Sequence, residues 1–107
     1  MPAVHETAYP RLKEGVTPAE LPALAAAVAR LPRIALRGLM CIPPEETEPA
    51  RQRAWFARLR GLRDDLNAAG YSLDTLSMGM SADFEAAIEE GATIVRLGTV
   101  LFGARPR

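Results

Sequence analysis

The apolar residues of this chain recur at two spacings, and their alternation predicts an α/β protein. Short continuous apolar runs predict buried strands. They occupy residues 34–40, 73–78 and 93–97. Longer segments with apolar residues three or four positions apart predict amphipathic helices. They occupy residues 17–31, 49–69 and 81–91. Because helix and strand alternate from residue 17 onward, the pattern predicts parallel βαβ units with right-handed crossovers.

The first predicted helix begins with a capping box, in which Thr17 is the N-cap and Glu20 reaches back to its N–H group. Pro18 suits the first helical position. Pro22 lacks a backbone donor, so the regular helix is expected to start a few residues later. Pro32 ends the helix. Its predicted apolar face consists of Leu21, Leu24, Val28 and Leu31.

The second predicted helix is the longest, and its apolar stripe repeats at helical spacing. The stripe consists of Trp55 or Phe56, Leu59, Leu62 and Leu66. The arginines of this helix lie mostly off the stripe and are flanked by acidic residues. We therefore interpret them as a solvated face rather than as a site for an anionic partner. They are Arg51, Arg53, Arg58, Arg60 and Arg63. Gly70 closes the helix.

The third predicted helix begins at Ser81, which we expect to be its N-cap. Asp83 and Glu85 fall in the first turn, where negative charge suits the helix dipole. Gly91 is placed to end the helix.

Small residues follow both strands that flank this helix, namely Ser77 and Ser81 at the first strand and Gly98 and Thr99 at the second. Backbone N–H groups and hydroxyls of such residues can bind a phosphate group. In (β/α)₈ barrels a phosphate site recurs at the loops after the last two strands. The alternative is that Ser81 only caps its helix and the glycines only serve tight turns. The spacing leaves both interpretations open.

Residues 1–16 lack periodicity, and their prolines and glycine predict a loop. His5 is the only histidine, and no Asp, Cys or second His lies near it at metal-ligand spacing. We therefore predict an exposed loop histidine and no metal site.

Composition narrows the class of protein. Thirteen basic and thirteen acidic residues cancel, so charge draws the chain neither to nucleic acid nor to a membrane. The hydrophobic share of 49% favours a folded domain over disorder. Cys41 is the single cysteine, which excludes an internal disulfide and fits a cytoplasmic protein. No activating histidine lies near Cys41, so we predict a buried, unreactive thiol.

Two segments resemble a known family. The run SMGMSADFEAAIEEGATIVRLGTVLFG, which begins at Ser77, resembles the C-terminal signature of the YggS/PROSC family of pyridoxal phosphate homeostasis proteins. LPRIALRGLMCIP, residues 31–43, resembles that family's RGLMxIP strand. The resemblance covers residues 4–105 and places Val4 at the end of a strand. It implies a TIM-type barrel, similar to the N-terminal domain of alanine racemases, that binds pyridoxal 5′-phosphate (PLP) without established enzyme activity.

Members of this family are longer than the present chain. The resemblance therefore implies that residues 1–107 are the C-terminal part of such a domain, a partial (β/α)₈ barrel with parallel strands and alternating helices. A partial barrel leaves sheet edges open, and two copies could associate through them. We favour the alternative that Met1 is an internal start or that the gene is truncated.

The resemblance also assigns cofactor-binding residues. It places the phosphate at Ser81, Gly98 and Thr99, with Ser77 as a further candidate. By similarity to alanine racemases, Arg96 approaches the pyridine nitrogen and keeps it unprotonated through its permanent charge.

Two of these residues have alternative interpretations. Arg96 could instead pair with a carboxylate such as Asp83. Met40 either lines the cofactor pocket or packs in the core. The family's Schiff-base lysine lies on its first strand, and Lys13 matches a different position.

The sequence thus predicts a PLP-binding protein of intracellular PLP homeostasis that holds the cofactor non-covalently and has no catalytic residues of its own. A fragment of an alanine-racemase-like enzyme and a non-binding relic or interaction protein are the alternatives.

Overall fold

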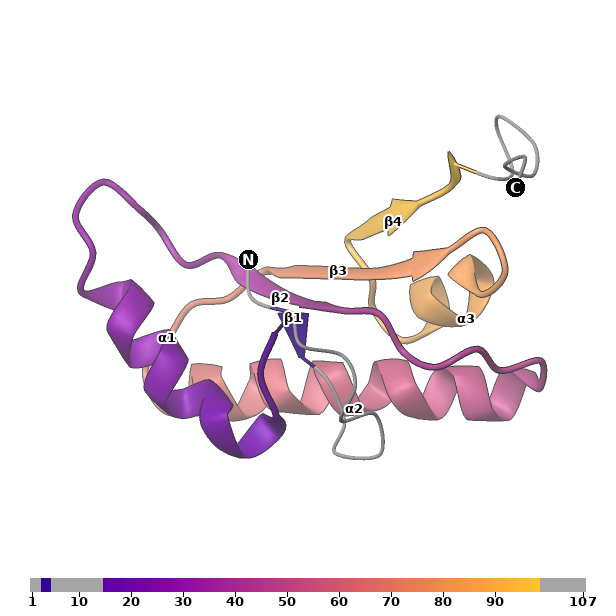
Figure 1. Cartoon of the computed structure of the whole chain (residues 1–107), viewed down its shortest axis with the longest axis horizontal. Coiled ribbons are helices and arrows are strands. Elements are labelled where there is room, and N and C mark those ends of the chain that lie inside the picture. Colours follow the sequence, from indigo (N-terminus) through magenta and orange to yellow (C-terminus); the bar gives the residue numbers. More distant parts are fainter. Residues whose placement is uncertain (1–2, 5–14, 99–107) are drawn as a thin grey trace.

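The computed structural model describes residues 3–4 and 15–98, which form a parallel four-stranded sheet and its helices (Figure 1). The strands lie side by side in chain order. They are β1 (Ala3–Val4), β2 (Gly38–Cys41), β3 (Thr75–Met80) and β4 (Ile94–Arg96). The helical elements between them are η1 (Pro18–Glu20), α1 (Leu21–Ala29), α2 (Pro49–Ala68) and α3 (Phe84–Glu89). The predicted alternation of helices and parallel strands is confirmed.

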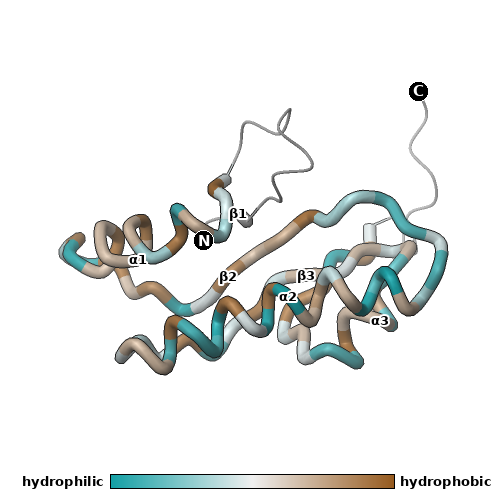
Figure 2. Tube along the Cα trace, turned by 90° about the horizontal axis from the view of Figure 1, so that it is seen from below, coloured by the Kyte–Doolittle hydropathy of each residue, from teal (hydrophilic) through white to brown (hydrophobic). Residues whose placement is uncertain are grey.

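The helices lie on one side of the sheet, and the core forms between the two layers (Figure 1). Leu39 of β2 is the register partner of Leu76 in β3, and both side chains are fully buried. Figure 2 shows the apolar residues along β2 and the mixture of apolar and polar residues along α2. The predicted stripe of α2 is confirmed, with Phe56 chosen over Trp55. Its buried residues are Phe56, Leu59 and Leu66, and Leu62 packs against them.

The strand predicted at residues 34–40 is shorter than expected. Pairing with β3 starts only at Gly38, where an added Cβ would lie 1.8 Å from the Thr75 carbonyl oxygen. Only glycine permits this close approach of the two strands. Ile34, predicted to be buried, is 57% exposed and lines a shallow apolar groove against α1. The strand predicted at 73–78 is likewise shifted toward the C-terminus.

The N-terminal segment was predicted to be a loop, and this prediction is wrong for residues 3–4. Ala3 pairs with Met40, and Val4 pairs with Cys41, so β1 is a parallel neighbour of β2. Two residues are too few to show periodicity, whereas the family resemblance had placed Val4 at a strand end. His5 and Lys13 lie outside the described residues.

Helix α1 starts at Leu21, so that Pro22 lies in its first turn, where its missing N–H group breaks no hydrogen bond of the helix. The chain first makes the 3₁₀ turn η1, and the Glu20 carboxylate accepts hydrogen bonds from Thr17 N (3.1 Å) and Thr17 Oγ1 (2.9 Å). These bonds lower the pKa of Glu20. The apolar face was only partly predicted, because Leu21 and Ala25 are its buried residues whereas Leu31 is 49% exposed.

Glycines end the other two helices, as predicted. Gly70 and Gly91 have φ angles of +111° and +100°, a conformation that glycine adopts without strain. After α3, Ala92 N donates to Ala87 O and Gly91 N donates to Ile88 O. This pair of bonds is a Schellman motif, and it satisfies two of the last carbonyl groups of the helix.

An ion-pair cluster joins α3 to α2 and corrects the prediction that the arginines of α2 are only a solvated face. The Glu90 side chain is 9% exposed. Its carboxylate accepts hydrogen bonds from Arg53 Nε (2.9 Å) and Arg60 Nη1 (2.8 Å), and Arg60 also reaches the Glu90 carbonyl oxygen (3.3 Å). The Arg53 hydrogen bond is the main cause of the lowered pKa of Glu90.

Within the part of the chain that the structure describes, no helix is long and apolar enough to cross a membrane.

Candidate functional site

The candidate residues gather where the strands end, because all four strands are parallel and their carboxyl ends lie together. We call this the carboxyl edge of the sheet. Strands β2, β3 and β4 end at Cys41, Met80 and Arg96, and these ends lie at the same edge. Ser81 follows the end of β3 directly, and Gly98 lies two residues beyond β4. This edge is where ligands bind in parallel α/β proteins.

Three predicted residues, Met40, Ser77 and Arg96, lie together with Met80 on the face of the sheet opposite the helices, which we call the inner face. Met40 is the register partner of Ser77, and Met80 is the register partner of Arg96. Successive strand residues point to opposite faces. The neighbours Leu39, Leu76 and Met78 are fully buried in the core, so Met40 and Ser77 are directed away from it.

A β-bulge in β3 keeps Met80 and Arg96 on the inner face. Ser77 pairs with Ile94, while Met80 pairs with Arg96, so β3 has one residue more than β4 in this interval. The bulge includes Gly79, which has a φ angle of +102°. A Cβ at Gly79 would lie 2.6 Å from the Ala87 Cβ, so glycine is needed there for α3 to pack closely on the strand.

Arg96 reaches across the inner face to Met40. Its Nη1 atom donates to Met40 Sδ at 3.6 Å, which brings together two residues 56 positions apart in the sequence. The Nε and Nη2 atoms of Arg96 are buried and have no hydrogen-bond partner among the residues that the structure describes. The alternative pairing with Asp83 is not formed in the described part of the chain. Nε and Nη2 form one edge of the guanidinium, the edge with which arginine binds an oxyanion or another acceptor.

Ser81 is not the N-cap of α3, which corrects the prediction. The helix starts at Phe84, and Asp83 is its N-cap. Asp83 Oδ1 accepts a hydrogen bond from Met80 N at 2.7 Å, and Asp83 N donates to Met80 O at 3.1 Å. We call residues 80–83, which these bonds close, the Ser81 turn. Ser81 therefore lies at the tip of a fixed turn rather than at a helix end.

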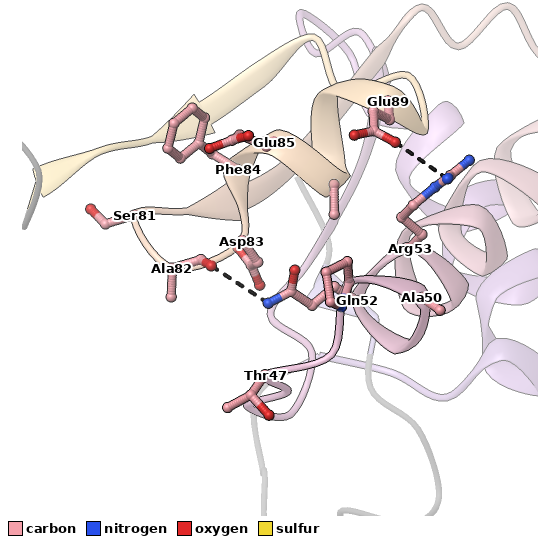
Figure 3. A pocket seen from close by; sticks show the side chains of 12 residues that line it. Thr47, Ala50, Gln52, Arg53, Ser81, Ala82, Asp83, Phe84, Glu85 and Glu89 are labelled. Atoms are coloured by element: carbon pink, nitrogen blue, oxygen red, sulfur yellow. Dashed lines mark hydrogen bonds and ion pairs between the residues drawn. The ribbon is translucent and has the colours of Figure 1, made fainter.

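A pocket of about 470 Å³ opens on the helix side of the Ser81 turn, between α2 and α3 (Figure 3). Gln52 spans its base and donates to Glu46 O (2.8 Å) and Ala82 O (3.5 Å). Its charged residues are Arg53, Asp83, Glu85 and Glu89. Three carboxylates against one arginine make this pocket unsuitable for a phosphate. In Figure 3 the Ser81 side chain projects from the turn away from α2.

Cys41 lies at the same sheet edge, but on the core side. It is 7% exposed, and burial, together with the charge of Asp83, raises the pKa of its thiol to about 12, although nearby Arg96 opposes the shift. The thiol is therefore protonated at neutral pH, as expected of the unreactive cysteine predicted from the sequence.

Thr99 and Gly98 are the remaining predicted site residues. Thr99 lies outside the described residues. Gly98 is exposed, and a Cβ added there would meet no atom of the described residues within 4 Å. No group of His, Cys, Asp and Glu side chains suited to a metal ion occurs in residues 3–4 and 15–98.

The chain is similar to several known proteins over most of its length. The sequence profile of the family described as "Alanine racemase, N-terminal domain" matches residues 10–106. Proteins named "Pyridoxal phosphate homeostasis protein" from Pseudomonas aeruginosa and Escherichia coli K12 are 63% and 52% identical over 93 residues. These matches cover 87% of this chain but only 39% and 40% of the two relatives.

A solved structure shows the same fold. PipY of Synechococcus elongatus, determined with PLP bound, superposes with a TM-score of 0.78 at 39% identity, covering 86% of this chain and 44% of PipY. The predicted partial TIM-type barrel and the YggS/PROSC resemblance are thereby confirmed. The chain belongs to the family of the alanine racemase N-terminal domain.

Proposed function

We propose that this chain binds PLP non-covalently at the carboxyl edge of its sheet and takes part in PLP homeostasis. The observation that carries the proposal is Arg96, whose buried Nε and Nη2 atoms on the inner face have no hydrogen-bond partner within residues 3–4 and 15–98. Buried donors are almost always satisfied, so their partner is expected from a molecule that covers this face. The relatives' name and the PLP in PipY indicate which molecule that is.

The phosphate end of the proposed site comprises the Ser81 hydroxyl, the Gly98 backbone and Thr99. Ser81 and Gly98 follow neighbouring parallel strands, which places them at the same sheet edge. Gly98 has no side chain, and no atom of the described residues would lie within 4 Å of a Cβ added there, so its backbone is open to a bulky anion from this part of the chain. Ser77 lies deeper on the inner face and is buried, so we propose it as a contact near the ring rather than with the phosphate.

The ring end of the proposed site comprises Arg96 and Met40. Bound PLP supplies an electron sink for amino-acid chemistry, and the sink is strong only when the ring nitrogen is protonated. A permanently charged guanidinium donates to that nitrogen and keeps it unprotonated. Met40 Sδ holds the guanidinium from the other side. This arrangement weakens the ring as an electron sink, while the guanidinium and Met40 hold the ring end of the cofactor in place.

The chain spans about 40% of the length of the curated relatives it matches. We therefore propose residues 1–107 as the C-terminal part of the PLP-binding barrel domain. The resemblance places the family's Schiff-base lysine outside the segment matched by this chain, and Lys13 does not correspond to it. We further propose a cytoplasmic location, where the single thiol stays reduced.

The experiment is equilibrium dialysis of the purified chain against PLP and against pyridoxal, which lacks the phosphate. We expect tighter binding of PLP and a loss of that preference, by about tenfold or more, in the double variant Ser81→Ala/Gly98→Val. Ser72→Ala is the control, because Ser72 is exposed and lies before β3, at the opposite end of the strand.

Equal binding of PLP and pyridoxal by the wild-type chain contradicts the proposal. The molecular mass in solution is recorded in the same samples, because self-association through open sheet edges could form part of the binding unit. Incubation with D- or L-alanine and added PLP tests the racemase alternative, for which turnover is the positive result.

A further inference from the structure

The Ser81 turn is closed by a pair of reciprocal hydrogen bonds that both involve Asp83. Its carboxylate accepts from Met80 N at 2.7 Å, and its own N–H donates to Met80 O at 3.1 Å. The same pair occurs at the start of η1, where Glu20 Oε1 accepts from Thr17 N at 3.1 Å and Glu20 N donates to Thr17 O at 3.0 Å. The described residues thus contain this hydrogen-bonded turn at both Asp83 and Glu20. Of these two turns, the one at Asp83 adjoins the proposed cofactor site.

Met80 connects this turn to the other end of the site. It is the last residue of β3 and the register partner of Arg96, the last residue of β4. The two hydrogen bonds between Asp83 and Met80 therefore fix the Ser81 turn to β3 and β4, the strand pair that carries Arg96. Ser81 and Arg96 are the residues assigned to the phosphate and to the ring nitrogen.

We propose that Asp83 is a positioning residue that sets the spacing between the phosphate end and the ring end of the cofactor site. The inference rests on the proposed function. Asp83 carries a negative charge, so direct contact with a phosphate is unfavourable, and its action is through Met80 and Ser81. Two properties of the side chain can be separated: the oxygen that accepts from Met80 N and the negative charge.

Two substitutions at this position separate them. Asp83→Ala removes both the acceptor and the charge, whereas Asp83→Asn removes the charge and keeps an Oδ1 acceptor for Met80 N. Glu20→Ala is the matched control, because it removes the equivalent hydrogen bond from a turn away from the sheet edge that carries Ser81 and Arg96.

The test measures the phosphate preference, defined as the dissociation constant for pyridoxal divided by that for PLP. We expect Asp83→Ala to lower it about tenfold, through weaker PLP binding with unchanged pyridoxal binding. Asp83→Asn and Glu20→Ala are expected to retain the wild-type preference or, for Asn, to exceed it because a repulsive charge is lost. Amide hydrogen exchange at Met80, without cofactor, is expected to be faster in Asp83→Ala and unchanged in Asp83→Asn.

Three results overturn the inference. A wild-type preference retained by Asp83→Ala shows that the turn needs no positioning. An equal rise in PLP affinity in both Asp83 variants shows that Asp83 acts only as a charge. Equal weakening of PLP and pyridoxal binding in Asp83→Ala shows a general loss of structure. In each case the wild-type chain still prefers PLP, whereas no preference in the wild type refutes the proposed function itself.

Discussion

Replacing Glu90 with glutamine is expected to destabilise the chain by about 2 kcal/mol. Glu90 accepts two charged hydrogen bonds, from Arg53 and Arg60, and its side chain is only 9% exposed. A charged hydrogen bond contributes about 1.5–3 kcal/mol when buried. The side chains of Arg53 and Arg60 are 51% and 41% exposed. Solvent screening therefore reduces the combined contribution of the two hydrogen bonds to roughly 2 kcal/mol.

The assay is urea or thermal unfolding of the wild type, Glu90→Gln and the control Glu89→Gln. Glu89 contacts the same arginine, at 3.3 Å from Arg53 Nη1, but its side chain is 56% exposed. We expect a change below about 0.5 kcal/mol for Glu89→Gln. For a domain of this size 2 kcal/mol corresponds to a fall in Tm of about 10 °C. Equal effects of the two substitutions would refute the reasoning, because burial would then not matter.

The same ion-pair cluster gives a pH dependence with a defined sign. The Arg53 hydrogen bond and the charges of both arginines hold the pKa of Glu90 below its ordinary value of 4.5, although desolvation opposes them. A lowered native pKa means that the stabilisation is fully present above pH 4.5 and is lost as the pH falls through the native value. The stability difference between wild type and Glu90→Gln is therefore expected to shrink below about pH 4.5. A difference that stays constant from pH 7 to acid contradicts this account.

Three further predictions concern glycines and the thiol. Gly38→Ala is expected to cost at least about 3 kcal/mol or to prevent folding, because its Cβ would overlap the Thr75 carbonyl oxygen, and circular dichroism measures the loss. Gly61→Ala is expected to stabilise α2 by about 0.5–1 kcal/mol, since the added Cβ would meet no atom of the described residues within 4 Å, and a lower midpoint in urea contradicts this. Native Cys41, with its pKa raised to about 12 by burial, is expected to react with a thiol reagent at pH 8 at least about a hundredfold more slowly than the urea-unfolded chain.

Features encoded by neighbouring residues were predictable from the sequence. The stripe through Phe56, Leu59 and Leu66 depends only on helical periodicity, and the ends at Gly70 and Gly91 depend on the conformational freedom of glycine. Each of these signals lies within about one or two helical turns, so no knowledge of tertiary contacts is needed to find it.

The start of α3 was predicted two residues too early because two cap-forming residues compete there. Ser81 and Asp83 are both favourable N-caps by residue type. The structure selects Asp83, since with the helix starting at Phe84 its carboxylate reaches Met80 N. A pattern of residue types cannot weigh that bond against the alternative cap.

The role of Glu90 could not be read from the sequence. Its partners Arg53 and Arg60 lie 37 and 30 residues away, on a helix whose polar face otherwise looks solvated. Arg96 presents the same difficulty, because its contact with Met40 spans 56 residues. The family resemblance, rather than periodicity, had brought those two residues together.

The hydrogen bonding of Thr93 has a consequence for the order in which the chain folds. Thr93 Oγ1 accepts from Leu76 N at 2.8 Å, and Thr93 N donates to Leu76 O at 2.9 Å, across 17 residues. The contact between Arg37 and Asp74, where β2 meets β3, spans 37 residues. Closing the longer loop costs about 0.7 kcal/mol more in chain entropy. We therefore expect β3, α3 and β4 to form the folding nucleus, onto which β2 pairs later, so that changes at Thr93 slow folding more than changes at Arg37.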